Sequence, residues 1–150
     1  MACQSDGLVR RRLGDNRMID WYWILLLMVF CHIIEDFHIQ GILAHLKQES
    51  WWFNQTGYNW KYSKDYIPPL LLHGLEWSVF IHIPLLFEYG LTIPIFVSVI
   101  VNSLIHSYID NLKCNRLKIN LVQDQIFHIV QILITGIAIT LYYSTIILVL

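Results

Sequence analysis

The run at residues 126–150 contains no Lys, Arg, Asp or Glu. As a helix it would be roughly 37 Å long at 1.5 Å per residue, which is enough for a hydrocarbon core of about 30 Å. The whole chain agrees with this, because 56% of its residues are hydrophobic, 14% are charged and its mean hydropathy is +0.51. These values lie far from those of soluble domains and predict a membrane protein.

Two further apolar segments precede this run. One covers about residues 70–87, with Pro84 as an expected kink, and the next begins near Thr92, a candidate helix cap, and continues past residue 105. Gly90 marks the turn between them. We therefore predict a helical hairpin in this part of the chain.

The first apolar segment begins near residues 19–21 and must extend beyond His32. Residues 21–31 alone would give only about 16 Å of helix, too little to cross a bilayer. The predicted fold class is thus all-α, an integral membrane four-helix bundle with up-down-up-down topology. Residues 1–18 are expected to form a polar tail and residues 19–150 the transmembrane domain.

The connection between the first two predicted helices is rich in Trp and Tyr and carries Lys47, Lys61 and Lys64. Aromatic and basic side chains favour the headgroup level of a membrane. The segment is interpreted as an interfacial connection with a short helix lying flat, or as an ordinary loop.

Each predicted helix also carries a stripe of polar residues at spacings of three or four, which places them on one helical face. The stripes lie late in the first and third helices and early in the second and fourth, so up-down-up-down topology would bring all four to one side of the membrane. Their members are His32, Asp36 and Gln40; His73 and Glu76; Asn102, His106 and Asp110; and Asp124, His128 and Gln131.

Three aspartates at this depth are costly. Insertion scales charge about 2.5–3.5 kcal/mol for one aspartate at a helix centre, so Asp36, Asp110 and Asp124 together would cost several kcal/mol. Protonation, pairing with histidinium or a bound cation would neutralise them.

Imidazole and carboxylate donors are the ligands that borderline divalent metals prefer, and bundles hold such ions with inward-facing His and carboxylate side chains. We therefore expect a mononuclear or dinuclear site for zinc, with iron and manganese as alternatives. The alternative is a hydrogen-bonded polar network that joins the helices without a metal. The expected ligands are His32, Asp36, His73, His106, Asp110, Asp124 and His128.

Other polar residues fall off the stripes. His38, His45 and His82 are interpreted as interfacial or packing histidines, and Glu35 either supports the stripe or faces the headgroups. The three cysteines have no CxxC spacing, so no disulfide framework or cysteine zinc site is predicted, although Cys114 is a minor ligand candidate.

Four short motifs resemble those of a family of small bacterial and phage membrane proteins catalogued as domain of unknown function 3307. The motifs are HIIEDFHIQ, LLLHGLEW, HSYIDNLK and DQIFHIVQ, and the likeness covers about residues 21–150. It implies four transmembrane helices that gather the motif His and Asp residues, and a bacterial inner-membrane location or a phage origin. It implies no activity, and the arginine-bearing tail and the tryptophan-rich connection depart from the family pattern.

Three functions are compatible with these residues. A metal-dependent hydrolase could activate water at the metal for attack on an ester or lipid-linked substrate, with Glu76 as general base and Gln40 orienting the substrate. A proton or metal-ion carrier would need a continuous polar path, but the opposite half of the predicted bundle is nearly wholly apolar. The third is a structural or interaction protein whose polar cluster stabilises the bundle.

The expected partner is the lipid bilayer. Nucleic acid is not expected, because the net charge is −1 and the basic residues are not gathered on one face. Orientation stays open, since four arginines in the tail oppose six basic residues in the loops on the site side. The sequence makes no statement about oligomeric state.

Overall fold

The computed structural model describes residues 21–149, which form helices and turns and contain no strand. The all-α prediction is confirmed for this part of the chain, while the predicted polar tail at residues 1–18 lies outside it. Within residues 21–149, four helices are long and apolar enough to cross a membrane, which is the pattern of a multi-pass membrane protein. These candidate spans are Trp21–Ile39, Trp60–Tyr89, Ile93–Cys114 and Leu121–Ile146.

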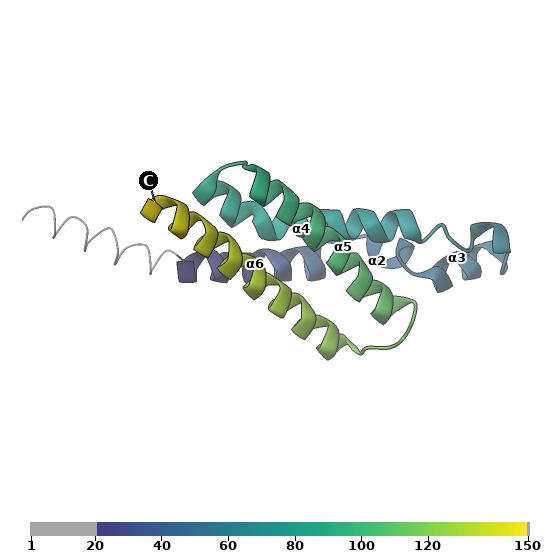
Figure 1. Cartoon of the computed structure of the whole chain (residues 1–150). Coiled ribbons are helices and arrows are strands. Elements are labelled where there is room, and N and C mark those ends of the chain that lie inside the picture. Colours follow the sequence, from purple (N-terminus) through teal and green to yellow (C-terminus); the bar gives the residue numbers. More distant parts are fainter. Residues whose placement is uncertain (1–20, 150) are drawn as a thin grey trace, which may run out of the picture.

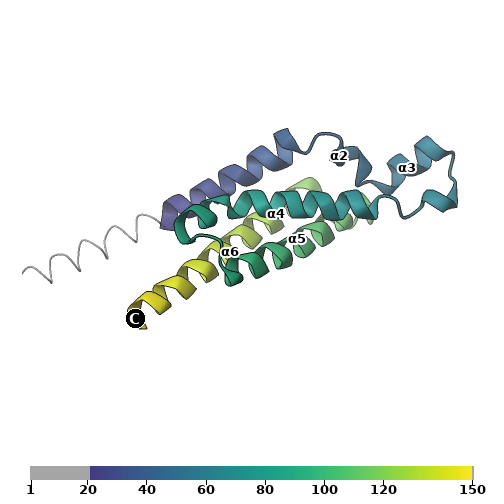
Figure 2. The same ribbon diagram turned by 90° about the horizontal axis from the view of Figure 1, so that it is seen from above.

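The four long helices lie alongside one another, and the connecting segment with α2 and α3 projects from one end (Figures 1 and 2). Two glycines allow close approach. A Cβ on Gly74 of α4 (Ile67–Tyr89) would lie 2.7 Å from the backbone oxygen of Ser103 in α5 (Ile93–Cys114). Gly136 of α6 (Leu121–Val149) lies similarly close to Leu25. At these two glycines the helix backbone lies directly against the neighbouring helix, with no room for a side chain.

α4 and α5 form the predicted hairpin. Prolines occupy the first turn of each helix, and Pro84 lies inside α4. Gly90 ends α4 with φ of 73°, a conformation that favours glycine. Thr92 is at the N-cap position of α5 as predicted, but its hydroxyl makes no capping bond and pairs instead with the hydroxyl of Tyr143.

The first span does not continue as a regular α-helix through its polar residues. Residues 21–34 are α-helical, and η1 (Glu35–Ile39) is a π-helical turn. Its wide hydrogen bond runs from the backbone N–H of Gln40 to the backbone carbonyl of Glu35, at 3.1 Å. Such wide turns are rare and often occur at functional sites. This turn departs from the continuous helix that the sequence predicts.

The connection between the first span and α4 contains three short helices, α2 (Leu43–Leu46), α3 (Glu49–Thr56) and η2 (Trp60–Tyr62). The short helix expected in this segment is therefore present. Several of its aromatic side chains are exposed, among them Tyr58 and Trp60, as suits a headgroup-level segment. In contrast, Lys47 is only 3% exposed, because it points back among the long helices.

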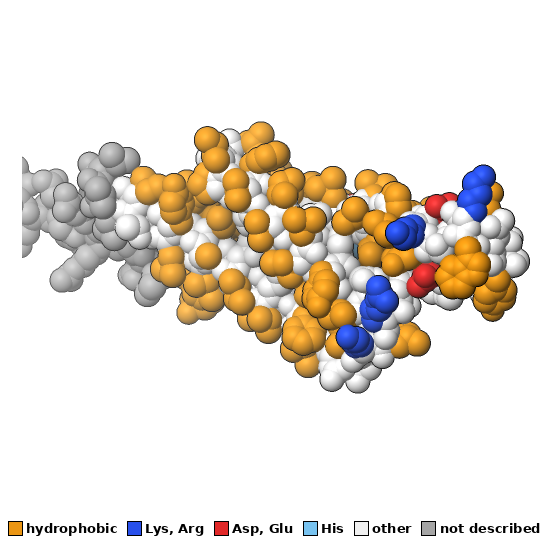
Figure 3. Space-filling model, turned by 45° about the vertical axis from the view of Figure 1, so that its right-hand side comes forward, with side chains coloured by type: hydrophobic (Ala, Val, Ile, Leu, Met, Phe, Trp, Pro, Cys, Tyr) orange, Lys and Arg blue, Asp and Glu red, His pale blue; other side chains and the backbone are white. Residues whose placement is uncertain are grey.

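The apolar core lies between the long helices on the side away from the connecting segment. On the surface of the molecule, apolar side chains cover the length of the long helices, and the charged side chains gather toward the end that carries α3 (Figure 3). This distribution matches helices that face hydrocarbon and an end that faces headgroups and water. The buried core residues are Ile24, Met28, Trp77, Ile81, Leu85, Ile95, Ile132 and Ile139.

Candidate metal centre

The four spans bring their polar stripes together. All seven predicted ligands lie in a single cluster near the connecting segment. Five of them belong to groups whose donor atoms are close enough to share an ion, and a sixth, Asp124, pairs with His128 of such a group. The groups are Asp36, His73 and His106; His106, Asp110 and His128; and Glu35, His73 and Glu76. We call this cluster the His/Asp centre.

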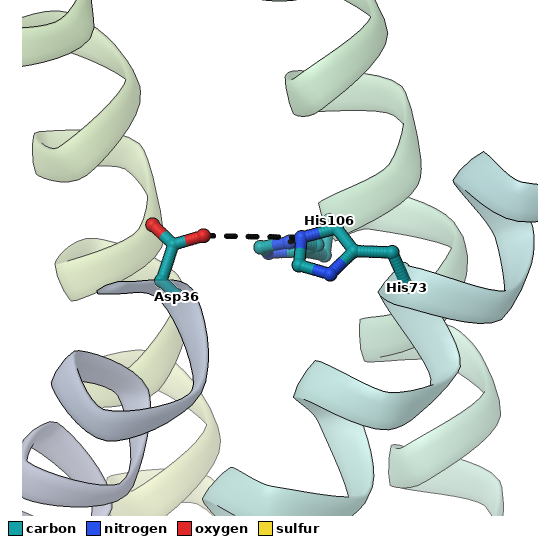
Figure 4. Close-up of side chains that lie close together, drawn as sticks. All are labelled: Asp36, His73 and His106. Carbon is teal, nitrogen blue, oxygen red and sulfur yellow. Dashed lines mark hydrogen bonds and ion pairs between the residues drawn. The ribbon is translucent and has the colours of Figure 1, made fainter. Parts of the chain in front are cut away.

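The first group lies between the first span, α4 and α5. Asp36 faces His73 and His106 across the space between the helices, with 3.8 Å between Asp36 Oδ1 and His73 Nε2 (Figure 4). His73 Nε2 is also 3.2 Å from His106 Nε2 and 3.3 Å from Asp110 Oδ2. Ligands at 2.0–2.1 Å around one tetrahedral ion are about 3.3 Å apart, so these spacings suit a shared cation.

The second group lies between α5 and α6. His128 Nε2 is 3.6 Å from Asp110 Oδ1 and 3.4 Å from Asp124 Oδ1. The His106 ring packs against those of Trp77 and His128, with 4.1 Å between ring centroids in each pair, and the Trp77 and His128 rings are themselves 5.4 Å apart. Asp110 therefore presents one carboxylate oxygen to each group, and His106 is common to both.

Many polar atoms of the centre lack hydrogen-bond partners. Buried nitrogens and oxygens are normally paired, because leaving one unpaired costs about 1–3 kcal/mol. Here eight such atoms cluster in one place; Glu35 Oε1 and His73 Nδ1 lie 3.2 Å apart and face each other, and a bound cation is a fitting occupant for the others. Within the described residues the eight atoms are both Glu35 carboxylate oxygens, Nδ1 of His73 and His106, Oδ1 of Asp110 and Asp124, and both ring nitrogens of His128.

Glu35 lies behind His73. Its carboxylate is fully buried, and its Oε1 is 3.2 Å from His73 Nδ1, on the opposite side of the ring from Nε2. A carboxylate in this place orients a metal-binding imidazole and raises its basicity. Of the two readings of Glu35, support of the stripe is the one the structure adopts. Glu76 is half-buried in the same group.

His32 occupies a different position from the other predicted ligands. Trp77 Nε1 donates to His32 Nδ1 at 2.8 Å, so in the neutral ring Nε2 carries the proton and donates to Gln125 Oε1 at 3.1 Å. The Gln125 amide in turn donates to Asp36 Oδ2 at 2.8 Å and to Asp124 Oδ2 at 3.1 Å. His32 thus orients the carboxylates through Gln125, a residue that the sequence analysis did not single out.

The side chain of Gln40 also hydrogen-bonds to Asp36. Its amide donates to the Asp36 carboxylate at 2.7 Å and to the Asp36 carbonyl at 2.9 Å. The predicted roles of Gln40 in orienting substrate and of Glu76 as general base stay predictions.

Two lysines neutralise part of the carboxylate charge, a possibility that the sequence analysis did not consider. Lys47 Nζ lies 2.5 Å from Asp110 Oδ2, and Lys113 Nζ lies 2.5 Å from Asp124 Oδ2. Lys113 could have been found, since it follows Asp110 by three residues on one helical face. Lys47 comes from the connecting segment, where no periodicity points inward.

A second polar layer lies one turn farther into the helices. Gln131 donates to the Asn102 side-chain oxygen at 2.8 Å, Thr135 donates to the same oxygen at 3.0 Å, and Asn102 donates to Ser98. Ser98 Oγ is in turn 2.9 Å from His82 Nε2. Polar side chains therefore extend deeper than the sequence analysis expected.

The histidines predicted to lie off the stripes behave as interfacial or packing residues. His38 and His45 are exposed, and His82 is fully buried with its ring nitrogens placed by Ser78 and Ser98. Cys31 and Cys114 are half-buried free thiols, and none of the candidate metal groups among the described residues includes them.

A groove of about 410 Å³ opens between α5 and α6 beside the centre. Ile105, Ile109 and Phe127 line its apolar wall, and these are sequence neighbours of His106, Asp110 and His128. Asn102 and Gln131 contribute its polar lining. The groove therefore borders the layer of Asn102 and Gln131, and no candidate ligand of the centre lines it.

No protein-family model, curated protein or solved structure matches the chain. The resemblance to domain of unknown function 3307 stays a prediction that rests on the four quoted motifs. The coordination chemistry of the centre is therefore the basis for a functional proposal.

Proposed function

We propose that this chain is a multi-pass membrane protein whose four spans form an up-down-up-down bundle around a divalent metal. The topology is supported by the position of the centre, because its residues come late in the first and third spans and early in the second and fourth. Side chains so placed meet only if successive spans run in opposite directions. Membrane orientation stays open, and a bacterial or phage origin stays a prediction.

The observation that carries the metal proposal is the set of unpaired buried donors. Imidazole nitrogens and carboxylate oxygens converge from all four spans at 3.2–4.0 Å spacing, and eight polar atoms of the centre lack a hydrogen-bond partner within the described residues. The donor set mixes nitrogen and oxygen, as zinc, iron and manganese sites do. Zinc is our first expectation for the bound ion.

We propose hydrolysis of an ester or lipid-linked substrate as the reaction. A metal held by His and Asp can supply hydroxide near neutral pH. The apolar groove between α5 and α6 supports a lipid-linked substrate, because it runs along the spans beside Asn102 and Gln131, about one helical turn from His106 and His128. Glu76, half-buried next to His73, is the candidate general base.

A structural role is the second candidate, and the lysine pairs favour it. Lys47 and Lys113 each contact a carboxylate at 2.5 Å, so part of the cluster is neutral without a metal. A purely structural cluster would lose stability on substitution of its residues but would bind no metal and support no turnover.

Metal content tests the first proposal. Full-length protein purified in detergent and exposed to Zn²⁺ should retain metal after desalting, and His106→Ala should lose most of it because His106 belongs to two of the three groups. His82→Leu is the matched control, since His82 is equally buried on the neighbouring helix but lies outside the centre. Metal near zero in all samples, or equal metal in wild type and His106→Ala, would contradict the proposal.

Turnover tests the reaction. Metal-loaded protein in lipid nanodiscs should hydrolyse members of a panel of lipid esters and phosphodiesters, and His106→Ala should reduce the rate by at least a hundredfold. Glu76→Gln should lower the rate while metal content stays at the wild-type value. Metal-replete protein that is inert on the whole panel would remove hydrolysis and leave metal binding intact.

A further inference from the structure

The donors of the His/Asp centre fall into two halves that share Asp110 and His106. One half consists of Asp36, His73 and His106 with Asp110 Oδ2, and the other of His106, Asp110 Oδ1 and His128 with Asp124. A carboxylate that presents one oxygen to each half is the bridge expected in a dinuclear centre. The question is which half takes an ion.

Lys47 occupies the first half. Its ammonium lies 2.5 Å from Asp110 Oδ2, the same oxygen that is 3.3 Å from His73 Nε2. The side chain is 4% exposed, so this cation is held inside the protein. An ion bound by His73 and Asp110 Oδ2 would lie within a few ångströms of a fixed positive charge, where repulsion in a low-dielectric interior is strong.

The second half has its donors free. Asp110 Oδ1, Asp124 Oδ1 and both nitrogens of His128 are buried and make no hydrogen bond within the described residues. The lysine nearest to this half, Lys113, contacts the outer oxygen of Asp124 and is 4.0 Å from Asp110 Oδ1. Lys113 therefore also pairs with this half, but more distantly from Asp110, and its side chain is 23% exposed against 4% for Lys47, so water screens its charge more strongly.

The charges agree with a single ion. Four carboxylates with buried side chains belong to the centre, those of Glu35, Asp36, Asp110 and Asp124. With the histidines neutral, the two lysines reduce their charge from −4 to −2. One divalent cation neutralises this remainder, so the wild-type centre needs no second ion for charge balance.

We infer that the centre binds one divalent metal, held by Asp110 Oδ1, Asp124 Oδ1, His106 and His128, and that the Lys47 ammonium takes the place of a second metal in the half formed by Asp36 and His73. Lys47 is thus a residue that determines metal number. This inference rests on the proposed metal binding and adds to it the location and count of the ion.

Stoichiometry tests the count. Wild-type full-length protein loaded with Zn²⁺ and desalted should hold about one zinc per chain by elemental analysis. Lys47→Gln should hold close to two, because the first half is then relieved of its ammonium. Lys113→Gln is the matched control and should stay at one, because Lys113 does not contact the oxygens of the first half.

Two zinc ions in wild type, or a count that Lys47→Gln does not raise, would overturn the inference. Lys47→Met, which keeps the length of the side chain, gives the same reading if the glutamine variant folds poorly. Zinc near zero in wild type and all variants would instead be a failure of the proposed metal binding, so the two failures are distinguishable.

Single-ligand variants test the location. Asp124→Asn and His128→Gln should each reduce the zinc affinity of the wild-type site by at least tenfold, whereas His73→Gln should leave the count at one and change the affinity less than threefold. The reverse order, with His73→Gln the more damaging, would place the ion in the first half and overturn the inference.

Discussion

His73 and His82 lie on opposite sides of α4, about two and a half turns apart, and both side chains are fully buried. His82 meets neutral partners, the Ser78 carbonyl at 2.7 Å and the Ser98 hydroxyl at 2.9 Å. His73 meets a carboxylate at each ring nitrogen and a second imidazole at 3.2 Å. Burial is the same in the two regions, so the kind of partner separates a packing histidine from a candidate ligand.

The largest effect expected in this comparison comes from Asp110→Asn. The substitution leaves Lys47 buried without its counter-charge, and breaking a buried pair typically costs about 3–5 kcal/mol. Unfolding in detergent micelles, followed by circular dichroism, measures the loss. The double variant Lys47→Met with Asp110→Leu removes both charges and should regain most of the stability while binding no metal. Wild-type stability in Asp110→Asn would contradict the pair.

Removal of metal should have the next largest effect. An ion present at a thousand times its dissociation constant stabilises the folded state by about 4 kcal/mol, and a chelator removes this contribution. Thermal unfolding of Zn²⁺-loaded protein should therefore shift downward when EDTA is added. His82→Leu should respond as wild type does and His106→Ala should not respond. A chelator effect that persists in His106→Ala would place the stabilising ion elsewhere.

Gly74→Ala tests the packing that sets His73 against His106. The added Cβ would lie 2.7 Å from the Ser103 carbonyl oxygen, so α4 and α5 must move apart. Overpacking of this kind costs about 1–3 kcal/mol, and the same movement should weaken zinc binding. Denaturant unfolding and zinc titration measure the two effects. Gly57→Ala is a useful control for the added methyl group, since its Cβ would meet nothing within 4 Å, although its positive φ adds strain of its own. Wild-type values for both properties in Gly74→Ala would show that the helices are less tightly packed.

His82→Leu should have a smaller effect and confine it to stability. The variant loses the hydrogen bond to Ser98, worth about 0.5–1.5 kcal/mol net, and keeps an apolar side chain in the core. Zinc content measured on the same preparation should equal that of wild type. A loss of zinc would show that His82 also supports the His/Asp centre, which would contradict the distinction drawn here between His82 and His73.

Gln40→Ala should have the smallest effect. Gln40 and Asp36 are four residues apart, and a polar pair at this helical spacing contributes about 0.2–0.5 kcal/mol. Gln125 still donates to Asp36 in this variant, so zinc content should not change. If turnover falls while stability and zinc content hold, Gln40 acts on the substrate as the sequence analysis predicted.

The positions of the long helices could be predicted from hydropathy alone, because twenty or so apolar residues without charge have few alternatives to a membrane span. α4 and α5 begin close to the predicted residues, and proline and glycine mark their ends. The gathering of the His and Asp stripes followed from spacing and depth. Both predictions use local periodicity, which a single sequence carries directly.

The parts that could not be predicted depend on contacts between distant segments. Lys47 belongs to an irregular connection, so no period places its side chain against Asp110, 63 residues later. His32 shares the stripe of Asp36, yet the donor Trp77 on another helix turns its ring toward Gln125. Spacing gave the face on which each side chain lies, whereas the partner across the interface decides which atom is free to bind.

The π-helical turn at Glu35–Ile39 changes the direction in which the side chains that follow it along the first span point. One residue more per turn offsets everything after the turn by about 100° from the face that a regular α-helix would present. This offset accompanies the burial of Glu35 behind His73 and the direction of Asp36 toward the other helices. Deletion of a single residue here would barely change the hydropathy or the length of the span. It would, however, rotate the acidic pair relative to the imidazoles by about 100°. The number of residues in this turn is therefore constrained as well as their identity.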